Sequence, residues 1–319
     1  MVAGSLSVWS ETQSPDFDRQ VRQQTQTDRA WRLASRGRMS MEKISYPSRA
    51  GGLAIPAFIF SPLGHAAPGS RPALVWVHED VRGHLYEHYI PYVLDATSRG
   101  YIVIAPEYRG SIGYGRAFFD AIDYGGAEVD DVVTAVDVLK SSYLTVDASR
   151  IAVVGWSHGG LIAMLAVLRH PATFRAAVAM VPVTNLLQRL ELKGAARQHQ
   201  LIDPQNRFGG LPTDRPEVYR DRSPIFSIDT LKVPLYVAVA TNDEDVSIAE
   251  SMPLIEALRK RKPNLAETMV YVDPPGGHLF DRRVTPLTWQ PENTPQQVDS
   301  WKRIWKFLGR ALTVGEARR

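Results

Sequence analysis

The residues of this chain best suited to covalent chemistry lie in the segment 151–160, which reads Ile-Ala-Val-Val-Gly-Trp-Ser-His-Gly-Gly. Four apolar residues precede a G-x-S-x-G sequence, and an apolar helical segment, 161–165, follows it. This pattern predicts a strand, a sharp turn and a buried helix, with Ser157 at the apex of the turn. Gly155 and Gly159 fit this prediction because such a tight turn leaves no room for side chains. Ser157 is therefore the candidate nucleophile, provided that a base and an acid follow it along the chain.

A candidate acid and a candidate base follow later strand-like runs of the sequence. In a doubly wound hydrolase, the triad occurs in the chain order serine, aspartate, histidine, on loops at the carboxyl ends of strands. Three carboxylates, 243–245, follow the run 235–240, and His278 follows the run 269–272. His278 would accept the proton of Ser157, and one of the carboxylates would hold the imidazole in the required tautomer. The residue types alone leave open which of the three is the acid.

Length and composition are those of an ordinary globular protein. The 319 residues are enough for one large core or at most two domains, and 44% of them are apolar. Every apolar run falls well short of the roughly 18 residues that a membrane span needs, so the sequence predicts a soluble protein. The first thirty residues lack the apolar core of a signal peptide, which slightly favours the cytoplasm but leaves earlier removal of a leader open. The absence of cysteine excludes disulfides, thiolate catalysis and thiolate metal ligands.

The charge of the chain is small and dispersed. Its formal net charge at pH 7 is +3, and the densest basic run, 259–262, ends a predicted helix directly before Pro263. Cations at that position complement the helix dipole. We therefore expect no nucleic-acid partner, and the serine chemistry considered above requires no cofactor and no metal.

An alternation of strands and helices must position these residues. Short strand signals occur at 42–46 and 54–60, and apolar strand-like runs follow at 73–77, 101–105, 151–154, 176–181, 235–240 and 269–272. Apolar stripes with helical spacing are formed by Val129, Val132, Val133, Val136 and Leu139, and by Val298, Trp301, Trp305 and Leu308. The later strand-like runs do not alternate between apolar and polar residues, as expected for parallel strands that are covered on both faces. The sequence predicts an α/β fold with a mostly parallel, doubly wound sheet and helices on both faces.

Two segments fall outside this alternation. Residues 1–40 are polar and weakly amphipathic, and we expect them to form an N-terminal arm ahead of a domain that spans 41–312. Residues 182–232 show no strong periodicity, and so long a segment inside a domain is usually functional, which predicts a short cap or lid. Leu186 and Leu187 would either line an acyl pocket beneath this cap or form its small core.

Several motifs occur in order along the chain. They are Tyr-Arg-Gly-Ser-Ile-Gly-Tyr-Gly at 108–115, Gly-Ala-Glu at 126–128 with Asp131, the serine turn, Ser223-Pro224, and Asp243 with Val246. Over roughly residues 50–310 the chain thereby resembles the catalytic domain of the prolyl oligopeptidase family, which includes acylaminoacyl and dipeptidyl peptidases. The resemblance implies an α/β-hydrolase fold and selects Asp243 as the acid, because the family's acid lies three residues before a valine. It also implies that Val246 lines the pocket for the residue before the cleaved bond.

Two features depart from the family pattern. The family's large N-terminal β-propeller, which filters peptides by size, has no counterpart in the roughly forty residues before the first strand, so we expect a freestanding domain closer in build to an esterase. Where relatives commonly show His-Gly-Gly-Pro, this chain has His78, Glu79, Asp80 and Val81. We expect the backbone N–H groups of His158 and Glu79 to form the oxyanion hole, and His78 and Val81 to border the substrate pocket. The two carboxylates would point away from the oxyanion or bind a cationic group of the substrate.

The sequence thus predicts a serine hydrolase that cleaves carboxylic esters through an acyl-enzyme intermediate. The alternatives are an acylaminoacyl- or dipeptidyl-type serine peptidase and a non-catalytic binding protein with the hydrolase fold. The segment 84–88 also matches the zinc-protease pattern H-x-x-E-H, whose histidines share one face of a helix, but this pattern needs a third protein ligand from elsewhere. The expected substrate is a small ester or a short acyl-peptide, and a homo-oligomer is left open.

Overall fold

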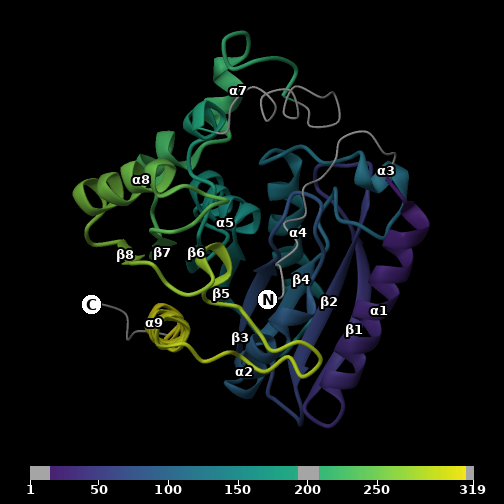
Figure 1. The fold of residues 1–319 in the computed structure, drawn as a ribbon. Helices are drawn as coiled ribbons and strands as arrows, with labels where there is room; N and C mark the ends of the chain where they lie inside the picture. The colour runs from purple at the N-terminus through teal and green to yellow at the C-terminus, as the bar shows by residue number, and fades with distance from the viewer. Residues whose placement is uncertain (1–14, 193–207, 314–319) are drawn as a thin grey trace, which may run out of the picture.

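The computed structural model describes residues 15–192 and 208–313, which are built around an eight-stranded sheet (Figure 1). The strands are β1 (Met39–Pro47), β2 (Ala54–Pro62), β3 (Arg71–Val77), β4 (Ile102–Pro106), β5 (Val146–Trp156), β6 (Ala176–Met180), β7 (Leu235–Ala240) and β8 (Ala266–Tyr271). Their order across the sheet is β1-β2-β4-β3-β5-β6-β7-β8. The strands β1 and β2 run antiparallel to their neighbours, and the others are parallel to one another. Each strand-like run of the sequence becomes one of these strands, and the mostly parallel sheet is confirmed.

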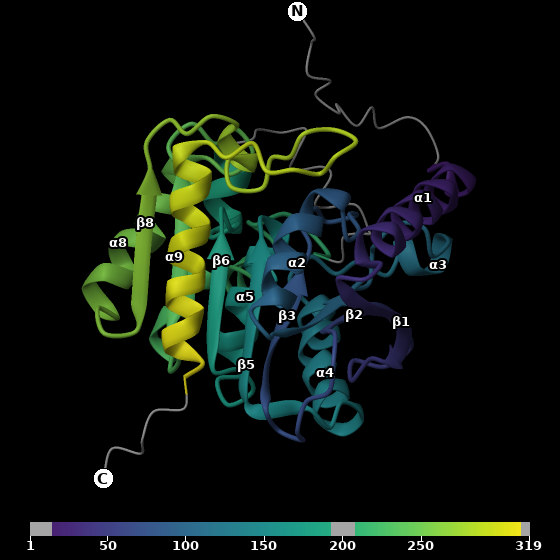
Figure 2. The same cartoon turned by 90° about the horizontal axis from the view of Figure 1, so that it is seen from below.

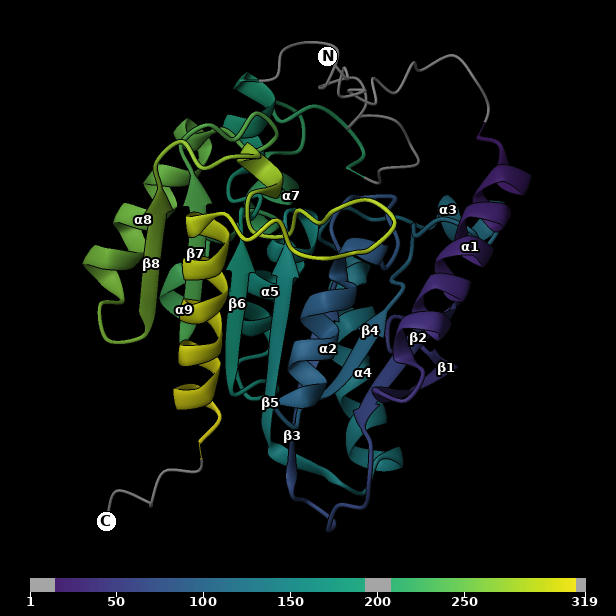
Figure 3. The ribbon, with the colours of Figure 1, turned by 60° about the horizontal axis from the view of Figure 1, so that its bottom comes forward.

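Helices cover both faces of the sheet. They are α1 (Phe17–Ser35), α2 (Ile90–Ser98), α3 (Arg116–Phe119), α4 (Ala127–Ser142), α5 (His158–Arg169), α7 (Pro216–Asp221), α8 (Ile248–Arg261) and α9 (Pro295–Ala311), with short 3-10 helices η1 (Glu87–Tyr89), η3 (Pro224–Phe226), η4 (Ile228–Thr230) and η5 (Gly277–Leu279). One apolar core contains residues of α4, α5 and α8, and a second core, on the opposite face, contains residues of α1, α2 and α9 (Figure 3). This is the doubly wound arrangement that the sequence predicted. In the described part of the chain, no helix combines the length and the apolar content needed to cross a bilayer.

Helix α1 packs beside the β1 end of the sheet (Figure 2). Trp31 is completely buried, and its ring centroid lies 4.7 Å from that of Phe60. Its indole Nε1 donates a hydrogen bond to the carbonyl of Leu85 at 3.0 Å. Helix α1 lies within the N-terminal arm expected over residues 1–40, of which 1–14 lie outside the described residues. The polar composition of the helix concealed the contact because the buried face of α1 also includes Gln20, Gln24 and Thr27.

The segment expected to form a cap, 182–232, is described only in part, because residues 193–207 lie outside the described residues. Residues 186–192 are helical, and α7, η3 and η4 follow after the gap. Phe208 and Tyr219 are buried, and their ring centroids are 4.6 Å apart. The described part therefore packs through its own aromatic contacts, and the function of the segment as a cap stays a prediction.

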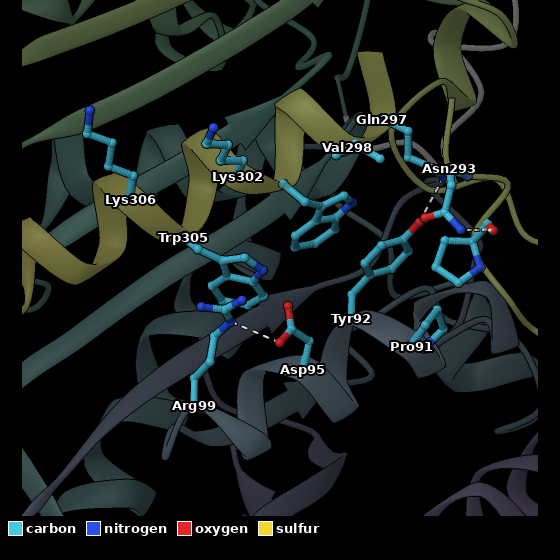
Figure 4. A pocket seen from close by; sticks show the side chains of 12 residues that line it. Pro91, Tyr92, Asp95, Arg99, Asn293, Gln297, Val298, Lys302, Trp305 and Lys306 are labelled. Atoms are coloured by element: carbon cyan, nitrogen blue, oxygen red, sulfur yellow. Dashed lines mark hydrogen bonds and ion pairs between the residues drawn. The ribbon is translucent and has the colours of Figure 1, made fainter. Parts of the chain in front are cut away.

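A surface groove of about 560 Å³ lies between α2 and α9 (Figure 4). The aromatic side chains of Tyr92, Trp301 and Trp305 are among those that line it. The rings of Tyr92 and Trp301 stack with their centroids 4.1 Å apart. The indole Nε1 of Trp301 donates a hydrogen bond to the carbonyl of Asp281 at 2.6 Å, which joins α9 to the loop that follows β8.

Candidate active site

Ser157 lies in a sharp turn between β5, which ends at Trp156, and α5, which begins at His158. Its backbone angles, φ 52° and ψ −117°, are strained for a residue that carries a side chain and are typical of a nucleophile elbow. A Cβ atom on Gly155 would collide with the carbonyl of Gly159, so steric exclusion sets this turn. Ser157 is buried, with 8% of its surface exposed.

The candidate base and acid are in direct contact. His278 lies in η5, after β8, and its Nδ1 is 2.7 Å from Oδ2 of Asp243, which follows β7. The other oxygen of Asp243 accepts the backbone N–H groups of Asp245 at 2.9 Å and Val246 at 2.7 Å. These bonds fix the carboxylate so that it faces the imidazole. Asp243 therefore occupies the position of the acid that the resemblance selected among the three carboxylates.

The topology brings the three residues to one edge of the sheet. The strands β5, β7 and β8 are parallel, and their carboxyl ends point to the same side (Figure 3). Ser157, Asp243 and His278 follow these strands directly or within a few residues. Because Nδ1 of His278 contacts the carboxylate, its Nε2 is the atom available to accept a proton. The arrangement is suited to nucleophilic attack by a serine hydroxyl.

The loop after β3, residues 78–83, is the second element at this edge, and we call it the oxyanion loop. The N–H of Glu79, the expected oxyanion donor, donates instead to the hydroxyl of Tyr89 at 3.3 Å. Asp80 has a φ of 67°, a conformation that favours glycine, and it stands where relatives carry the second glycine of their motif. No acceptor within the described residues takes up the N–H of Asp80. The hydroxyl of Tyr108 donates a hydrogen bond to the carbonyl of Asp80 at 2.6 Å and so stabilises the conformation of the loop.

The residues expected to line the substrate pocket differ in accessibility. His78, Leu186 and Val246 are at most 1% exposed, whereas Val81 and Leu187 are partly exposed. Packing explains this result for the leucine and the valine, because Leu186 and Val246 belong to the apolar core and offer a ligand no free surface. For these two positions a role in the pocket would need movement of their neighbours. Val81 and Leu187 stay predicted pocket residues.

His78 supports the oxyanion loop from within the protein. Its Nδ1 is 2.7 Å from the carbonyl oxygen of Glu79, and its Nε2 is 3.0 Å from the hydroxyl of Ser111. Burial lowers the pKa of His78 to about 4, so the imidazole is neutral at pH 7. Glu107 lies 3.7 Å from Nε2 of this imidazole and accepts the N–H of Leu85 at 3.0 Å. Burial raises the pKa of Glu107 to about 8, so the loop rests on two uncharged side chains.

The two carboxylates of the oxyanion loop have opposite environments. Glu79 is buried, and although burial alone would raise its pKa, the charge of Arg282 and a contact with His88 hold that pKa well below its usual value. Asp80 is exposed and accepts a hydrogen bond from the hydroxyl of Tyr86 at 2.7 Å. Water reaches Asp80, but the protein around it restricts hydration, and this effect together with the charge of Glu79 raises its pKa. Glu79 is thus ionised and paired with Arg282, whereas Asp80 lies on the exposed side of the site.

Arg282 is a residue of this site that the sequence did not reveal. It lies four residues after His278, and its guanidinium is completely buried. Its Nε donates to Oε2 of Glu79 at 2.6 Å, although the two residues are 203 positions apart in the chain. No motif marks such a contact, and the only available signal was the unusual charge of the loop that relatives build from glycines.

The pattern H-x-x-E-H does not lie on a helix. Residues 84–86 are not helical, η1 begins at Glu87, and α2 begins only at Ile90. His84 is 1% exposed, and its Nε2 lies 3.3 Å from the side-chain nitrogen of Gln23, on α1. Nε2 of His88 lies 3.0 Å from Glu79. Because His84 precedes the helical residues, these histidines do not share a helix face as the zinc alternative requires. Within the described residues, no three candidate ligands gather into a site for a metal ion.

Comparison with known proteins places this architecture in a family context. A sequence model described as "Prolyl oligopeptidase family" matches residues 87–314. The chain is 28% identical over 227 residues to acylamino-acid-releasing enzyme 1 of Oryza sativa subsp. japonica, a match that covers 67% of this chain and 28% of that protein. It is 31% identical over 192 residues to dipeptidyl aminopeptidase BIII of Pseudoxanthomonas mexicana, which covers 58% of this chain and 27% of that protein. The chain thus spans little more than a quarter of the length of these relatives.

Solved structures share the fold. A puromycin-hydrolysing peptidase of Mycobacterium tuberculosis superimposes with a TM-score of 0.70 at 23% identity, covering 86% of this chain and 40% of that one. An acylaminoacyl peptidase of Pyrococcus horikoshii gives a TM-score of 0.70 at 18% identity, covering 90% of this chain and 44% of that one. At these identities the comparison establishes the α/β-hydrolase fold alone.

Proposed function

The chain belongs to the prolyl oligopeptidase family, and on that premise we propose that it is a serine peptidase acting on short peptides. The observation that carries the proposal is the 2.7 Å contact between Nδ1 of His278 and Asp243, at the sheet edge where the strained turn presents Ser157. A serine, an aspartate and a histidine in this chain order and on these loops are typical of a hydrolytic triad.

The proposed reaction has two steps. In the first, Oγ of Ser157 bonds to the carbonyl carbon of the substrate while Nε2 of His278 accepts the hydroxyl proton. His278 then gives that proton to the leaving amine, the C–N bond breaks, and an acyl-enzyme remains. In the second step, water attacks the ester carbon, His278 takes a proton from the water and returns it to Oγ, and the acid product leaves. Asp243 keeps the imidazole in the tautomer that has Nε2 free.

Two backbone N–H groups would stabilise the negative charge on the carbonyl oxygen. We assign one to His158, the residue after the nucleophile, and the other to Asp80. Asp80 replaces Glu79 in this role because the N–H of Glu79 already donates to Tyr89. Each such donor contributes on the order of 10²–10³ in rate, so the conformation of the oxyanion loop matters to turnover.

Peptide cleavage is favoured over the ester cleavage that the sequence alone suggested. The curated relatives described above are named as enzymes that release acylated amino acids or dipeptides. The same triad also forms an acyl-enzyme from an ester, whose alcohol leaves more readily than an amine. Ester turnover is therefore expected as well, and it does not separate an esterase from a peptidase.

The open carboxylate of Asp80 favours a substrate with a free amine. The negative charge of Glu79 is already paired with Arg282, so Asp80 is the carboxylate of the oxyanion loop that remains available to a cation of the substrate. The raised pKa of Asp80 means that its charged form gains from a cationic partner. A peptide whose amino terminus is unblocked supplies that partner.

A comparison of three chromogenic substrates tests the proposal. Alanyl p-nitroanilide has a free amine, N-acetyl-alanyl p-nitroanilide has a blocked amine, and p-nitrophenyl acetate is an ester. We expect anilide hydrolysis that Ser157→Ala reduces by about 10⁴–10⁶ in kcat, and a matched surface variant, Ser141→Ala on α4, should retain full activity. Ester hydrolysis without anilide hydrolysis would instead identify an esterase. Activity that persists in Ser157→Ala would remove the serine mechanism.

A further inference from the structure

The oxyanion loop is fastened by a buried ion pair at a position where relatives carry glycine. Glu79 stands at the first glycine of the family motif, and its side chain is 6% exposed. Arg282 contacts it through two nitrogens, with Nε 2.6 Å from Oε2 and Nη2 also on that oxygen. Oε1 of Glu79 lies 3.0 Å from Nε2 of His88. One oxygen of this carboxylate thus accepts from the guanidinium, and the other lies close to the imidazole of His88.

The same guanidinium also holds the loop of the catalytic histidine. Nη1 of Arg282 donates to the carbonyl of His278 at 2.8 Å and to Oδ1 of Asp281 at 2.9 Å. The contact with His278 is made by the main chain, so it leaves both imidazole nitrogens free for Asp243 and for the substrate. Arg282 therefore spans the distance between the oxyanion loop and the proposed general base.

A third connection reaches the serine turn. Oδ2 of Asp281 accepts a hydrogen bond from Nε1 of Trp156 at 2.7 Å, and Trp156 directly precedes Ser157. The side chains of Asp281 and Arg282 are both completely buried. Trp156 (serine turn), Glu79 (oxyanion loop) and His278 (histidine loop) thus meet at one buried pair of neighbouring residues.

We propose that Arg282 is a positioning residue that fixes the oxyanion loop relative to His278 and Ser157. The inference rests on the proposed function, since the positions it fixes have meaning only for that reaction. The physical reason is the fork of the guanidinium, which offers several donors in one plane and can serve a carboxylate and a carbonyl together. A loop without its glycines cannot obtain its shape from backbone freedom alone, and this loop obtains it from a side chain more than 200 residues away.

The principal variant is Arg282→Lys, which keeps the positive charge but lacks the several planar N–H donors of the guanidinium. A displacement of about 1 Å at a catalytic group can cost about 10²-fold in rate, so we expect kcat to fall by about 10² with KM changed by less than about threefold. The affinity for phenylboronic acid should fall by a similar factor. Ser157 adds to the boron of this compound, and the tetrahedral adduct places an oxygen in the oxyanion hole. A purely structural role would lower the amount of folded enzyme without this selective loss.

Two further variants keep the test decisive if removal of the charge impairs folding. Arg282→Met leaves Glu79 and Asp281 buried without their cation, which is strongly destabilising, whereas the double variant Glu79→Gln with Arg282→Met removes one of these charges and should recover part of the melting temperature. We expect the double variant to stay about 10²-fold below wild type in kcat, because its loop is still not fastened. The control is Asp28→Asn, which breaks the remote ion pair of Asp28 with Lys43 and should leave kcat unchanged.

The outcomes are distinguishable from failure of the proposed function. If wild type hydrolyses the anilide and Ser157→Ala does not, the function stands and the Arg282 variants test the positioning role alone. A kcat within about threefold of wild type in folded Arg282→Lys and in the double variant would overturn the inference. A loss of activity that only follows the folded fraction, with unchanged affinity for phenylboronic acid, would overturn it equally.

Discussion

The serine turn and the oxyanion loop face the same carbonyl group in the proposed reaction, but different forces hold them. In the serine turn the backbone is confined by contact, because a Cβ on Gly159 would collide with the carbonyl oxygens of Val77 and His78. In the oxyanion loop the backbone is held by side chains, with Arg282 on Glu79 and Tyr108 on the carbonyl of Asp80. One region depends on the absence of side chains and the other on their presence.

This difference determines how each region should respond to change. Steric confinement depends on uncharged backbone atoms in contact with the turn, here those of neighbours in sequence and of Val77 and His78. Ion pairs and hydrogen bonds between distant segments depend on protonation and on the integrity of remote loops. The serine turn should therefore be sensitive to added volume and insensitive to pH, whereas the oxyanion loop should show the opposite behaviour.

The largest expected effect concerns the base that both regions serve. Asp243→Asn should reduce kcat by roughly 10⁴, because an amide no longer selects the tautomer of His278 that has Nε2 free. Anilide hydrolysis measures the loss, and circular dichroism with a melting curve checks the fold. Asp245→Asn, on the same loop but with an exposed side chain, is the control and should retain activity. A loss below about tenfold in Asp243→Asn would mean that another carboxylate orients the histidine.

The second effect is a pH dependence of stability that we expect for the oxyanion loop and not for the serine turn. Glu107 lies under the oxyanion loop and its pKa is raised from 4.5 to about 8 by burial, so the folded protein keeps a proton that the unfolded chain has released. Its contribution to stability is fully present below pH 4.5 and is lost as the pH rises to about 8. At about 1.4 kcal/mol for each pKa unit, the difference between 4.5 and about 8 corresponds to a loss on the order of 5 kcal/mol.

Melting temperatures between pH 5 and pH 8 measure this contribution. In Glu107→Gln the amide oxygen still accepts the N–H of Leu85, and no proton is lost. The decline of stability with rising pH should therefore be smaller in the variant than in wild type, and the two curves should meet near pH 5. Parallel curves across this range would show that Glu107 carries its charge in the folded protein.

The fold was predictable from sequence where a strand or helix has a residue pattern of its own. Seven of the eight strands overlap apolar runs of four or more residues, β1 follows only from a weaker signal at 42–46, and the stripe that begins at Val129 became α4. The packing of α1 was not evident from an apolar pattern, because its buried face includes Gln20, Gln24 and Thr27 beside Trp31. Pro91, in the first turn of α2, is a common signal of a helix start and agrees with a start at Ile90.

The site was predictable where backbone sterics define it. The glycines of the serine turn, the order of the three candidate triad residues and the spacing of Asp243 from Val246 are local features that can be found in a sequence. The contact of Glu79 with Arg282 joins residues 203 positions apart and follows no pattern of residue types. For the same reason the engagement of the Glu79 N–H by Tyr89 could not be foreseen, since it depends on how η1 packs against the loop.

The third effect tests steric confinement in the serine turn. Gly159→Ala places a methyl group against backbone carbonyls that cannot rotate away, so we expect a loss of about 1–3 kcal/mol in the free energy of unfolding. Gly309→Ala in α9 is the matched control, because nothing lies within 4 Å of its added Cβ and helix propensity should raise stability by about 0.5–1 kcal/mol. Chemical denaturation at two pH values measures both variants, and the cost at Gly159 should not depend on pH. Equal stability of the two variants would show that the turn relaxes freely.

The smallest effect concerns the open face of the oxyanion loop. The carboxylate of Asp80 is exposed, near the charge of Glu79 and bonded to the hydroxyl of Tyr86, so a cationic amine of the substrate would relieve an unfavourable charge environment. A hydrogen bond to a charged group is worth roughly 1.5 kcal/mol, which corresponds to about tenfold in kcat/KM. Asp80→Asn should therefore lower kcat/KM for alanyl p-nitroanilide about tenfold more than for its N-acetyl form.

The ratio of the two substrates isolates the role of the carboxylate from that of the backbone. Any shift of the Asp80 N–H alters the oxyanion hole for both substrates alike and cancels in the ratio. Asp245→Asn again serves as the control, because it removes a negative charge at the same sheet edge without touching the oxyanion loop. If that variant changes the ratio as much as Asp80→Asn does, the amine responds to the general negative field of the site. If neither variant changes it, the substrate amine lies elsewhere, and the oxyanion loop contributes its backbone alone.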